Sequence, residues 1–121
     1  MSEQHVFIHD NIKVEHKQIR GGKGKAICRQ MLNADDIPAG SPFTMAAVNI
    51  LPPGCSIAVH KHEGNAEAYL IMSGSGAYTG RDGKVVRVKV GDVTICYDGE
   101  IHGLENDTQE PLQIGAFIAA K

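Results

Sequence analysis

Residues 54–74 read GCSIAVHKHEGNAEAYLIMSG, and the fold and the site that we expect both follow from this stretch. His60 and His62 stand two apart, so on a strand over Ile57 to His62 both imidazoles project from the same face. A Gly-Asn turn follows, and a returning strand over Ala66 to Met72 brings the carboxylate of Glu67 beside the histidines. Two imidazoles and one carboxylate on adjacent strands form part of a shell for a divalent metal ion.

The length and composition of the chain are those of one globular domain. It has 121 residues, 42% of them hydrophobic and 21% charged, which is enough to bury a core. The formal net charge of −2 argues against a nucleic acid or an anionic membrane as a partner held by charge. No apolar run is long enough to span a membrane, and Met1 to Asp10 lacks the apolar core of a signal peptide. We therefore expect a cytoplasmic protein.

Short apolar or alternating runs separated by turns recur along the whole chain. The 14 glycines favour tight turns over long helices, and Asp82-Gly83 is typical of a hairpin. We expect about ten strands, one helical turn at Ala34 to Ile37 and no longer helix, which makes an all-β sandwich or barrel. Residues 1–121 form one domain, with an N-terminal arm over about residues 1–24. The expected strands cover residues 6–8, 13–20, 25–32, 43–51, 57–62, 66–72, 77–79, 85–90, 93–97, 101–106 and 112–119.

The cysteines and most other histidines have simple interpretations. Three cysteines without a C-x-x-C pair indicate reduced thiols rather than a disulfide framework. Small buried apolar residues are the favoured interpretation, and a role near the site is the alternative for Cys55 and Cys96. His5, His9 and His16 lack a spacing that would group them around an ion, so we expect them at the surface.

His102 is the later histidine that lies within an expected strand, behind a glycine turn. Together with His60, His62 and Glu67 it would give a divalent ion four donors and leave two octahedral positions for water or substrate. Mixed nitrogen and oxygen donors favour Fe, Mn or Ni, with Zn or Co as alternatives. The competing interpretation is that these four polar residues only coat the solvated side of a sheet.

Two spaced motifs resemble those of the cupin superfamily. The first, G-x5-H-x-H-x(3,4)-E-x6-G, is met from Gly54 to Gly74 at every spacing. The second, G-x5-P-x-G-x2-H-x3-N, is met from Gly91 to Asn106, except that Tyr97 replaces the proline. The resemblance implies a small single-domain metal-binding cupin, which folds as a double-stranded β-helix, or jelly-roll barrel. It also implies that His60, His62, Glu67 and His102 are the metal ligands.

The resemblance leaves three functions open, because this superfamily supports many activities on one fold. The first is a mononuclear non-haem dioxygenase for a small oxygen-chelating substrate, similar to the acireductone, flavonol or thiol dioxygenases. The second is a metal-dependent isomerase or lyase of a small carbonyl compound or sugar, and the third is a protein that only binds a small ligand. Strand parity places Tyr69 and Ile71 on the face of Glu67, so Tyr69 is a candidate catalytic residue as well as a core aromatic.

A second copy of the chain is the partner that we expect besides the small-molecule substrate. The segments from Val6 to Ile8 and from Leu112 to Ala119 are apolar and are predicted as strands. Such strands pair or pack readily with another chain. We therefore expect a homodimer, partly on the resemblance.

Overall fold

The computed structural model describes residue 6 and residues 14–120. This part of the chain holds ten strands and two single turns of 3₁₀ helix. The N-terminal elements are β1 (Val14–Lys17), η2 (Ile19–Gly21), β2 (Ala26–Leu32), η3 (Ala34–Asp36) and β3 (Phe43–Leu51). The others are β4 (Ser56–Lys61), β5 (Asn65–Ser73), β6 (Ser75–Thr79), β7 (Val85–Lys89), β8 (Val93–Cys96), β9 (Ile101–Glu105) and β10 (Leu112–Ala120). No helix in the described ranges is long and apolar enough to cross a membrane.

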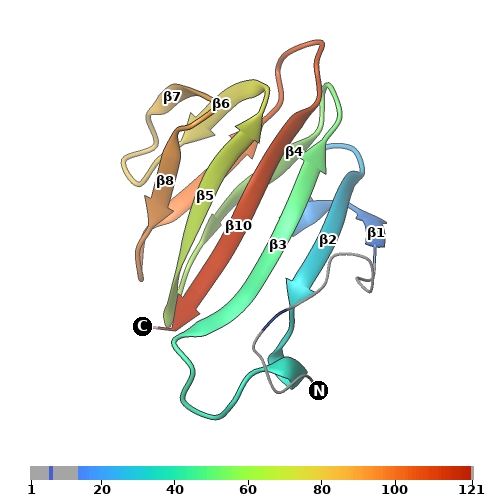
Figure 1. The fold of residues 1–121 in the computed structure, drawn as a ribbon. Helices are drawn as coiled ribbons and strands as arrows, with labels where there is room; N and C mark the ends of the chain where they lie inside the picture. Colours follow the sequence, from blue (N-terminus) through green and yellow to red (C-terminus); the bar gives the residue numbers. More distant parts are fainter. Residues whose placement is uncertain (1–5, 7–13, 121) are drawn as a thin grey trace.

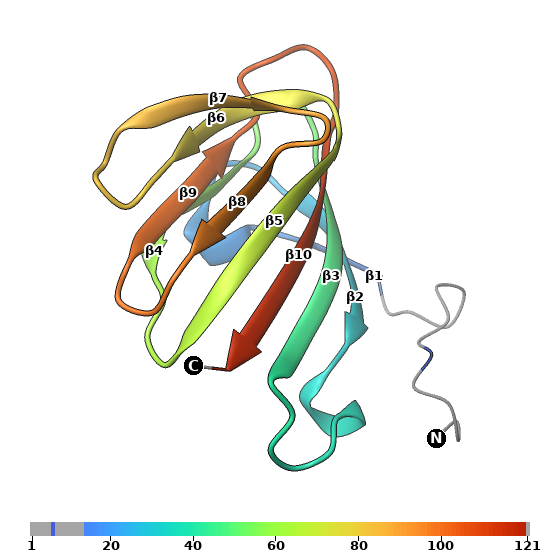
Figure 2. The same ribbon diagram turned by 60° about the vertical axis from the view of Figure 1, so that its left-hand side comes forward.

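Two antiparallel sheets face each other, as the all-β prediction requires. The six-stranded sheet has the order β1-β2-β3-β10-β5-β8 and is seen in Figure 1. The four-stranded sheet has the order β4-β9-β6-β7 and lies behind it, as Figure 2 shows. Strands that are neighbours in sequence, such as β4 and β5, lie in different sheets, so the chain winds between the two layers. This arrangement is the predicted jelly roll.

Alternation along the strands separates the interior from the surface. On β5, Tyr69 and Ile71 are 2% and 1% exposed, whereas Leu70 and Met72 between and beyond them face solvent. This is the period of two that a strand with one buried face requires. The buried side chains of both sheets form one core. It comprises Ala26, Leu51, Cys55, Ile57, Tyr69, Ile71, Tyr78, Val88, Leu104, Leu112, Ile114 and Ala116.

The four glycines of the two sequence motifs all lie where the chain turns. Gly54, Gly74, Gly91 and Gly99 have φ between 82° and 92°, a region that side chains with a Cβ rarely adopt. Gly74 has a second constraint, since a Cβ there would collide with the carbonyl of Pro111. The motif glycines therefore set the turns that connect the strands of the site.

Most predicted elements are present, with shifts of one or two residues at their ends. The predicted strand at Val6 to Ile8 lies outside the described residues except for Val6. β4 ends at Lys61, one residue before the predicted end at His62. The backbone N–H of His62 still donates a hydrogen bond to the Glu100 carbonyl, at 3.0 Å. The alternation predicted for β7 holds only in part, since Val88 is buried whereas Val86 is exposed.

Candidate metal centre and its pocket

Three strands from both sheets bring the four predicted ligands together. His60 lies on β4 and is paired with His102 on β9, and His62 follows directly after β4. Glu67 lies near the start of β5 in the other sheet, and its side chain faces inward. Strand pairing thus joins the two motifs, although His62 and His102 are 40 residues apart in the sequence.

The donor atoms lie at the separations that ligands of one ion show. His62 Nε2 is 3.0 Å from Glu67 Oε1 and 3.1 Å from His102 Nε2, and His60 Nε2 is 3.2 Å from His62 Nε2. His102 Nε2 is 3.1 Å from Glu67 Oε1, and all four donors lie within 4.8 Å of one another. Adjacent ligands of an octahedral ion, each about 2.1 Å from it, lie about 3 Å apart.

The outer nitrogen of each imidazole has a hydrogen-bond partner. His60 Nδ1 lies 2.7 Å from the Ala58 carbonyl, and His62 Nδ1 lies 2.8 Å from Asn65 Oδ1. Since both of these oxygens accept, each Nδ1 carries the proton and donates it, and each Nε2 keeps its lone pair. His102 Nδ1 is 3.1 Å from the Tyr78 hydroxyl. Such outer partners orient histidines that bind a metal ion.

The protonation states also suit a cation. Burial opposes ionisation of Glu67, but the contact of its Oε1 with His102 Nε2 and the nearby imidazoles of His60 and His62 outweigh it. The pKa of this carboxyl falls to about 2. Burial lowers the pKa of His102 against the opposing effect of Glu67, which favours the neutral imidazole. A carboxylate and neutral imidazoles are the forms that bind metal ions.

These donors fit a divalent metal ion. The Nε2 atoms of His60 and His62 face each other at 3.2 Å with a lone pair on each and no proton between them. A cation at this place would accept both lone pairs and remove their repulsion. The alternative that the four residues coat a solvated sheet face is wrong, because three are at most 6% exposed and His60 is largely buried.

A pocket of about 320 Å³ lies between the two sheets and is lined by three of the four donors, His60, His62 and Glu67. His102 is fully buried behind them. Among the described residues of its wall, the positively charged side chains are Lys17 of β1 and Arg20 of η2. Arg20 has φ 55° and ψ 32°, and it is the one residue other than glycine with positive φ in the part of the chain that the structure describes. The remaining wall residues outside the donor set are Ile19, Cys28, Gln30, Met45, Ala47, Asn49, Ile57, Asn65, Tyr69 and Ile118.

Tyr69, the predicted catalytic residue, lines this pocket, whereas Ile71 packs in the core instead. The Tyr69 ring stacks on the His102 ring, with centroids 4.7 Å apart and planes 20° apart. Burial, together with the charge of Glu67, raises the pKa of Tyr69 well above its ordinary value. Its hydroxyl therefore stays protonated near neutral pH.

Several side chains of the site did not stand out in the sequence. Tyr78 and Asn65 hold the outer nitrogens of two ligands, but each reaches its histidine through folding of the chain. Lys17 and Arg20 come from the N-terminal part of the chain, far before the first motif, and Asn49 comes from β3, the strand that precedes it. Of these side chains, only Asn65 had a signal in the sequence, because it directly follows the Gly64 turn between two of the predicted ligands.

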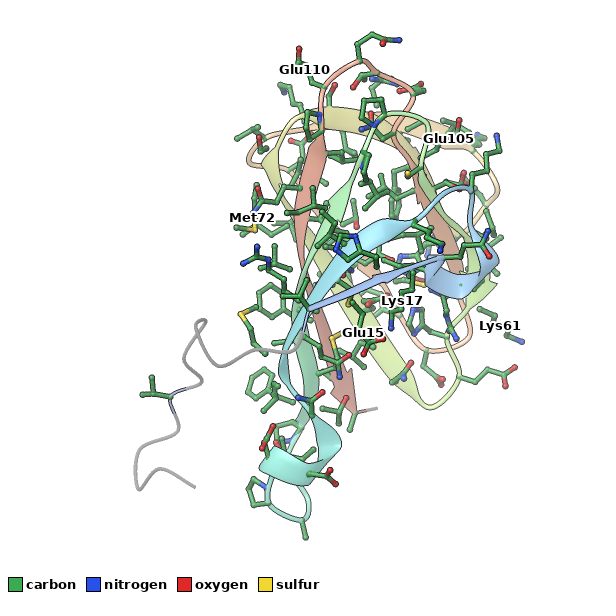
Figure 3. All side chains as sticks on the ribbon, turned by 90° about the vertical axis from the view of Figure 1, so that its right-hand side faces the viewer. Glu15, Lys17, Lys61, Met72, Glu105 and Glu110 are labelled. Atoms are coloured by element: carbon green, nitrogen blue, oxygen red, sulfur yellow. The ribbon has the colours of Figure 1, made fainter. Side chains whose placement is uncertain are left out.

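The remaining predictions near the site also have outcomes. Lys61 and Glu63 point away from the donors, as parity requires, and form a surface ion pair of 3.5 Å; Figure 3 shows Lys61 at the edge of the molecule. The three cysteines are free and buried, as the favoured interpretation states. His16 is exposed as predicted, and His5 and His9 lie outside the described residues.

Comparison with protein families identifies the fold and supports the site. The model of the cupin domain family matches residues 47–118, which is more than half of the chain. The chain belongs to the cupin family. The matched range contains all four candidate ligands of this cupin, together with both motifs.

Two curated relatives and two solved structures are similar to this cupin. The oxalate-binding protein of Thermotoga maritima is 37% identical over 100 residues, covering 83% of this chain and 80% of the relative. The gentisate 1,2-dioxygenase of a Streptomyces species is 27% identical over 93 residues, covering 77% of this chain but only 26% of that enzyme.

Of the two structures, one described as a predicted oxalate decarboxylase from Thermotoga maritima superposes with a TM-score of 0.86 at 34% identity. The superposition covers 96% of this chain and 99% of the other. The polyketide cyclase of Streptomyces resistomycificus has a TM-score of 0.75 at 19% identity, covers 97% and 79% of the two chains, and supports the fold alone.

Proposed function

We propose that this cupin binds a divalent metal ion through His60, His62, Glu67 and His102, and through that ion a small carboxylate that chelates with a second oxygen. The observation that carries the proposal is the convergence of the four donors, three of which line a pocket between the sheets. Four protein donors leave two positions of an octahedral ion for the two oxygens of the ligand. Oxalate and gentisate, named in the two relatives, both combine a carboxylate with a neighbouring oxygen.

The charges around the pocket favour such an anion. Glu67 offsets one of the two charges of a divalent ion, and Lys17 and Arg20 add two further positive charges to the wall. Opposite charge in a concave site raises the local concentration of a ligand and orients it. The overall negative charge of the chain is therefore no obstacle to binding an anion at this place.

We further propose oxygenation of the bound carboxylate as the reaction, with binding alone as the alternative. A bound iron or manganese ion would supply the Lewis-acid and one-electron chemistry that a reaction with O₂ requires. The chain itself would orient the ligand between the donors and the two cations and would keep water out on the core side. The similarity to gentisate dioxygenase supports this candidate, although this chain corresponds to about a quarter of that enzyme.

The isomerase or lyase alternative is less well supported by the pocket. Such a reaction needs a group that accepts a proton from the substrate. Among the described residues of the pocket wall, Glu67 is the one carboxylate, and it belongs to the donor set. Hence no second carboxylate in this part of the chain is placed to act as a free base.

The test starts with protein purified without an affinity tag or chelator. Elemental analysis gives the metal, and thermal unfolding with oxalate, gentisate or acetate then measures ligand binding to the metal-loaded protein. We expect oxalate or gentisate to raise the melting temperature, whereas acetate, which lacks a second oxygen group, leaves it unchanged. Protein that retains no metal, or that acetate stabilises equally, contradicts the binding proposal. Oxygen uptake with gentisate tests the proposed reaction. If no ligand that binds causes oxygen uptake, the oxygenation proposal is refuted and ligand binding without turnover stands.

A further inference from the structure

The side-chain amide of Asn49 lies in the wall of the pocket, and its oxygen has no hydrogen-bond partner among the described residues. It lies on β3, is 6% exposed, and lines the pocket. Its Oδ1 is buried and has no hydrogen-bond partner among the described residues. Buried polar atoms in folded proteins are nearly always paired, because an unpaired one loses its bonds to water without replacement. The inward positions on either side, Ala47 and Leu51, are apolar.

The strand register places this amide far from the metal donors. The order of the sheet is β3-β10-β5, with Asn49 on β3 and Glu67 on β5. Neighbouring strands lie about 4.8 Å apart, so the backbones of these two strands are about 10 Å apart. Asn49 also pairs with Ile114, which pairs with Ile71, four positions along β5 from Glu67. Oxalate on the metal ion is too short to reach the amide.

Small residues on the inner face leave a path between the two ends of the pocket. Ala47 pairs with Ala116, and this pair lies between Gln30 on β2 and Tyr69 on β5. Ala47 lines the pocket, and its methyl group takes up less of the space there than a larger side chain would. Gln30 lines the pocket beyond them, on the same side as Asn49.

We propose that Asn49, together with Gln30, binds hydroxyl groups at the end of the ligand remote from the metal ion. The ligand is then a hydroxylated carboxylic acid longer than oxalate. A hydroxyl both donates and accepts, so it pairs with the carbonyl oxygen or, after rotation of the amide about its last bond, with the NH₂ group. The inference rests on the proposed function for the metal-binding end of the ligand and assigns the other end.

The test compares two ligands that differ only in hydroxyl groups. Gluconate and 2-hydroxyhexanoate share chain length and the chelating 2-hydroxycarboxylate end, and oxalate serves as the short reference. We expect metal-loaded wild-type protein to bind gluconate about tenfold or more tightly than 2-hydroxyhexanoate by calorimetry, as one or two hydrogen bonds would give. Asn49→Leu should lower gluconate affinity about tenfold and leave oxalate and 2-hydroxyhexanoate unchanged.

A matched variant and a stability measurement separate ligand binding from a structural role. Gln113 lies on β10 with its side chain on the opposite face of the sheet, and Gln113→Leu should leave all three affinities unchanged. Because Asn49→Leu removes an unpaired polar atom, the ligand-free variant should melt at the same temperature as the wild type or higher. A lower melting temperature with equal losses for all ligands overturns the inference.

The outcome also distinguishes this inference from the proposed function. If oxalate binds but gluconate binds no more tightly than 2-hydroxyhexanoate, the subsite is refuted and metal-dependent chelation stands. If none of the three ligands binds to metal-loaded protein, both proposals are refuted.

Discussion

Tyr78→Phe removes a single hydroxyl group that contacts the outer nitrogen of a candidate metal ligand, His102. The hydroxyl lies 3.1 Å from His102 Nδ1, and His102 is fully buried. The phenyl ring of the variant keeps the edge contacts with the rings of His102 and Tyr69, at centroid distances of 5.8 and 6.4 Å. The change therefore tests one hydrogen bond with little effect on packing.

The loss should appear in both metal affinity and stability. Removing the outer partner of a ligating histidine lowers metal affinity about 10- to 100-fold, which is about 1.4 to 2.7 kcal/mol. In the metal-free protein the buried Nδ1 of His102 loses its partner, since no water reaches it, and the free energy of unfolding should fall by about 1–3 kcal/mol. Both effects have the same cause, so they should occur together.

Two assays measure these effects against a surface control. Competition with a chromophoric chelator gives the affinity for the metal found in the purified protein, and urea unfolding of metal-free protein gives stability. Tyr97→Phe makes the same chemical change at a side chain that is 59% exposed, and it should change neither quantity. If Tyr78→Phe binds the metal within about twofold of the wild type, the hydrogen bond does not orient His102 and the reasoning fails.

Three further predictions concern the donor set, the turns and the surface. His102→Ala should strip the metal from the purified protein, so full occupancy would rule out the four-ligand centre. Gly74→Ala should lower the melting temperature, because φ is 82° and its Cβ would meet Pro111; unchanged melting contradicts this. We also propose that the chain forms a homodimer through the apolar outer face of the six-stranded sheet. Met72→Glu on that face should yield monomers in light scattering, whereas the control Val86→Glu, on the other sheet, should leave the dimer intact. A wild-type protein that is itself a monomer would refute the proposal.

The outer face named in that proposal is visible in the structure but only partly in the sequence. Met72 projects outward in Figure 3, and its neighbours on β5, β10 and β8 are also apolar and exposed. They comprise Leu70, Phe117, Val93 and Ile95, which are between 39% and 60% exposed. The sequence pointed to the segment from Leu112 to Ala119, of which Phe117 is the most exposed apolar member. It did not indicate that β5 and β8 extend the same surface.

Local chemistry explains why the strands and turns were predictable. Alternation around Tyr69 and Ile71 follows from the period of two of any strand with one buried face. The motif glycines mark turns because positive φ is costly for other residues. The N-terminal end of the chain was less clear, because the mixed charges of residues 13–20 suit a strand or an extended arm. The structure has β1 followed by η2 there.

The ligand set was visible in the sequence because its chemistry is carried by residue type and spacing. His60, His62 and Glu67 are local, and parity is enough to put them on one side of their strands. His102 was assigned through the second motif, and the structure provides the physical link, which is its pairing with His60 across two strands. The expectation of a divalent metal site therefore needed little information about tertiary structure.

The surroundings of the ligands depended on tertiary structure alone. Tyr78 meets His102 because β6 pairs with β9. Lys17, Arg20 and Asn49 line the pocket because the elements from β1 to β3 pack against the other sheet. No local periodicity encodes such contacts, since they join segments that are distant in the chain. The stretch from Gly54 to Gly74 thus supplies three of the four candidate ligands through the period of a strand and the backbone freedom of glycine. The pocket beside these residues is lined by side chains that only the packing of the two sheets brings together.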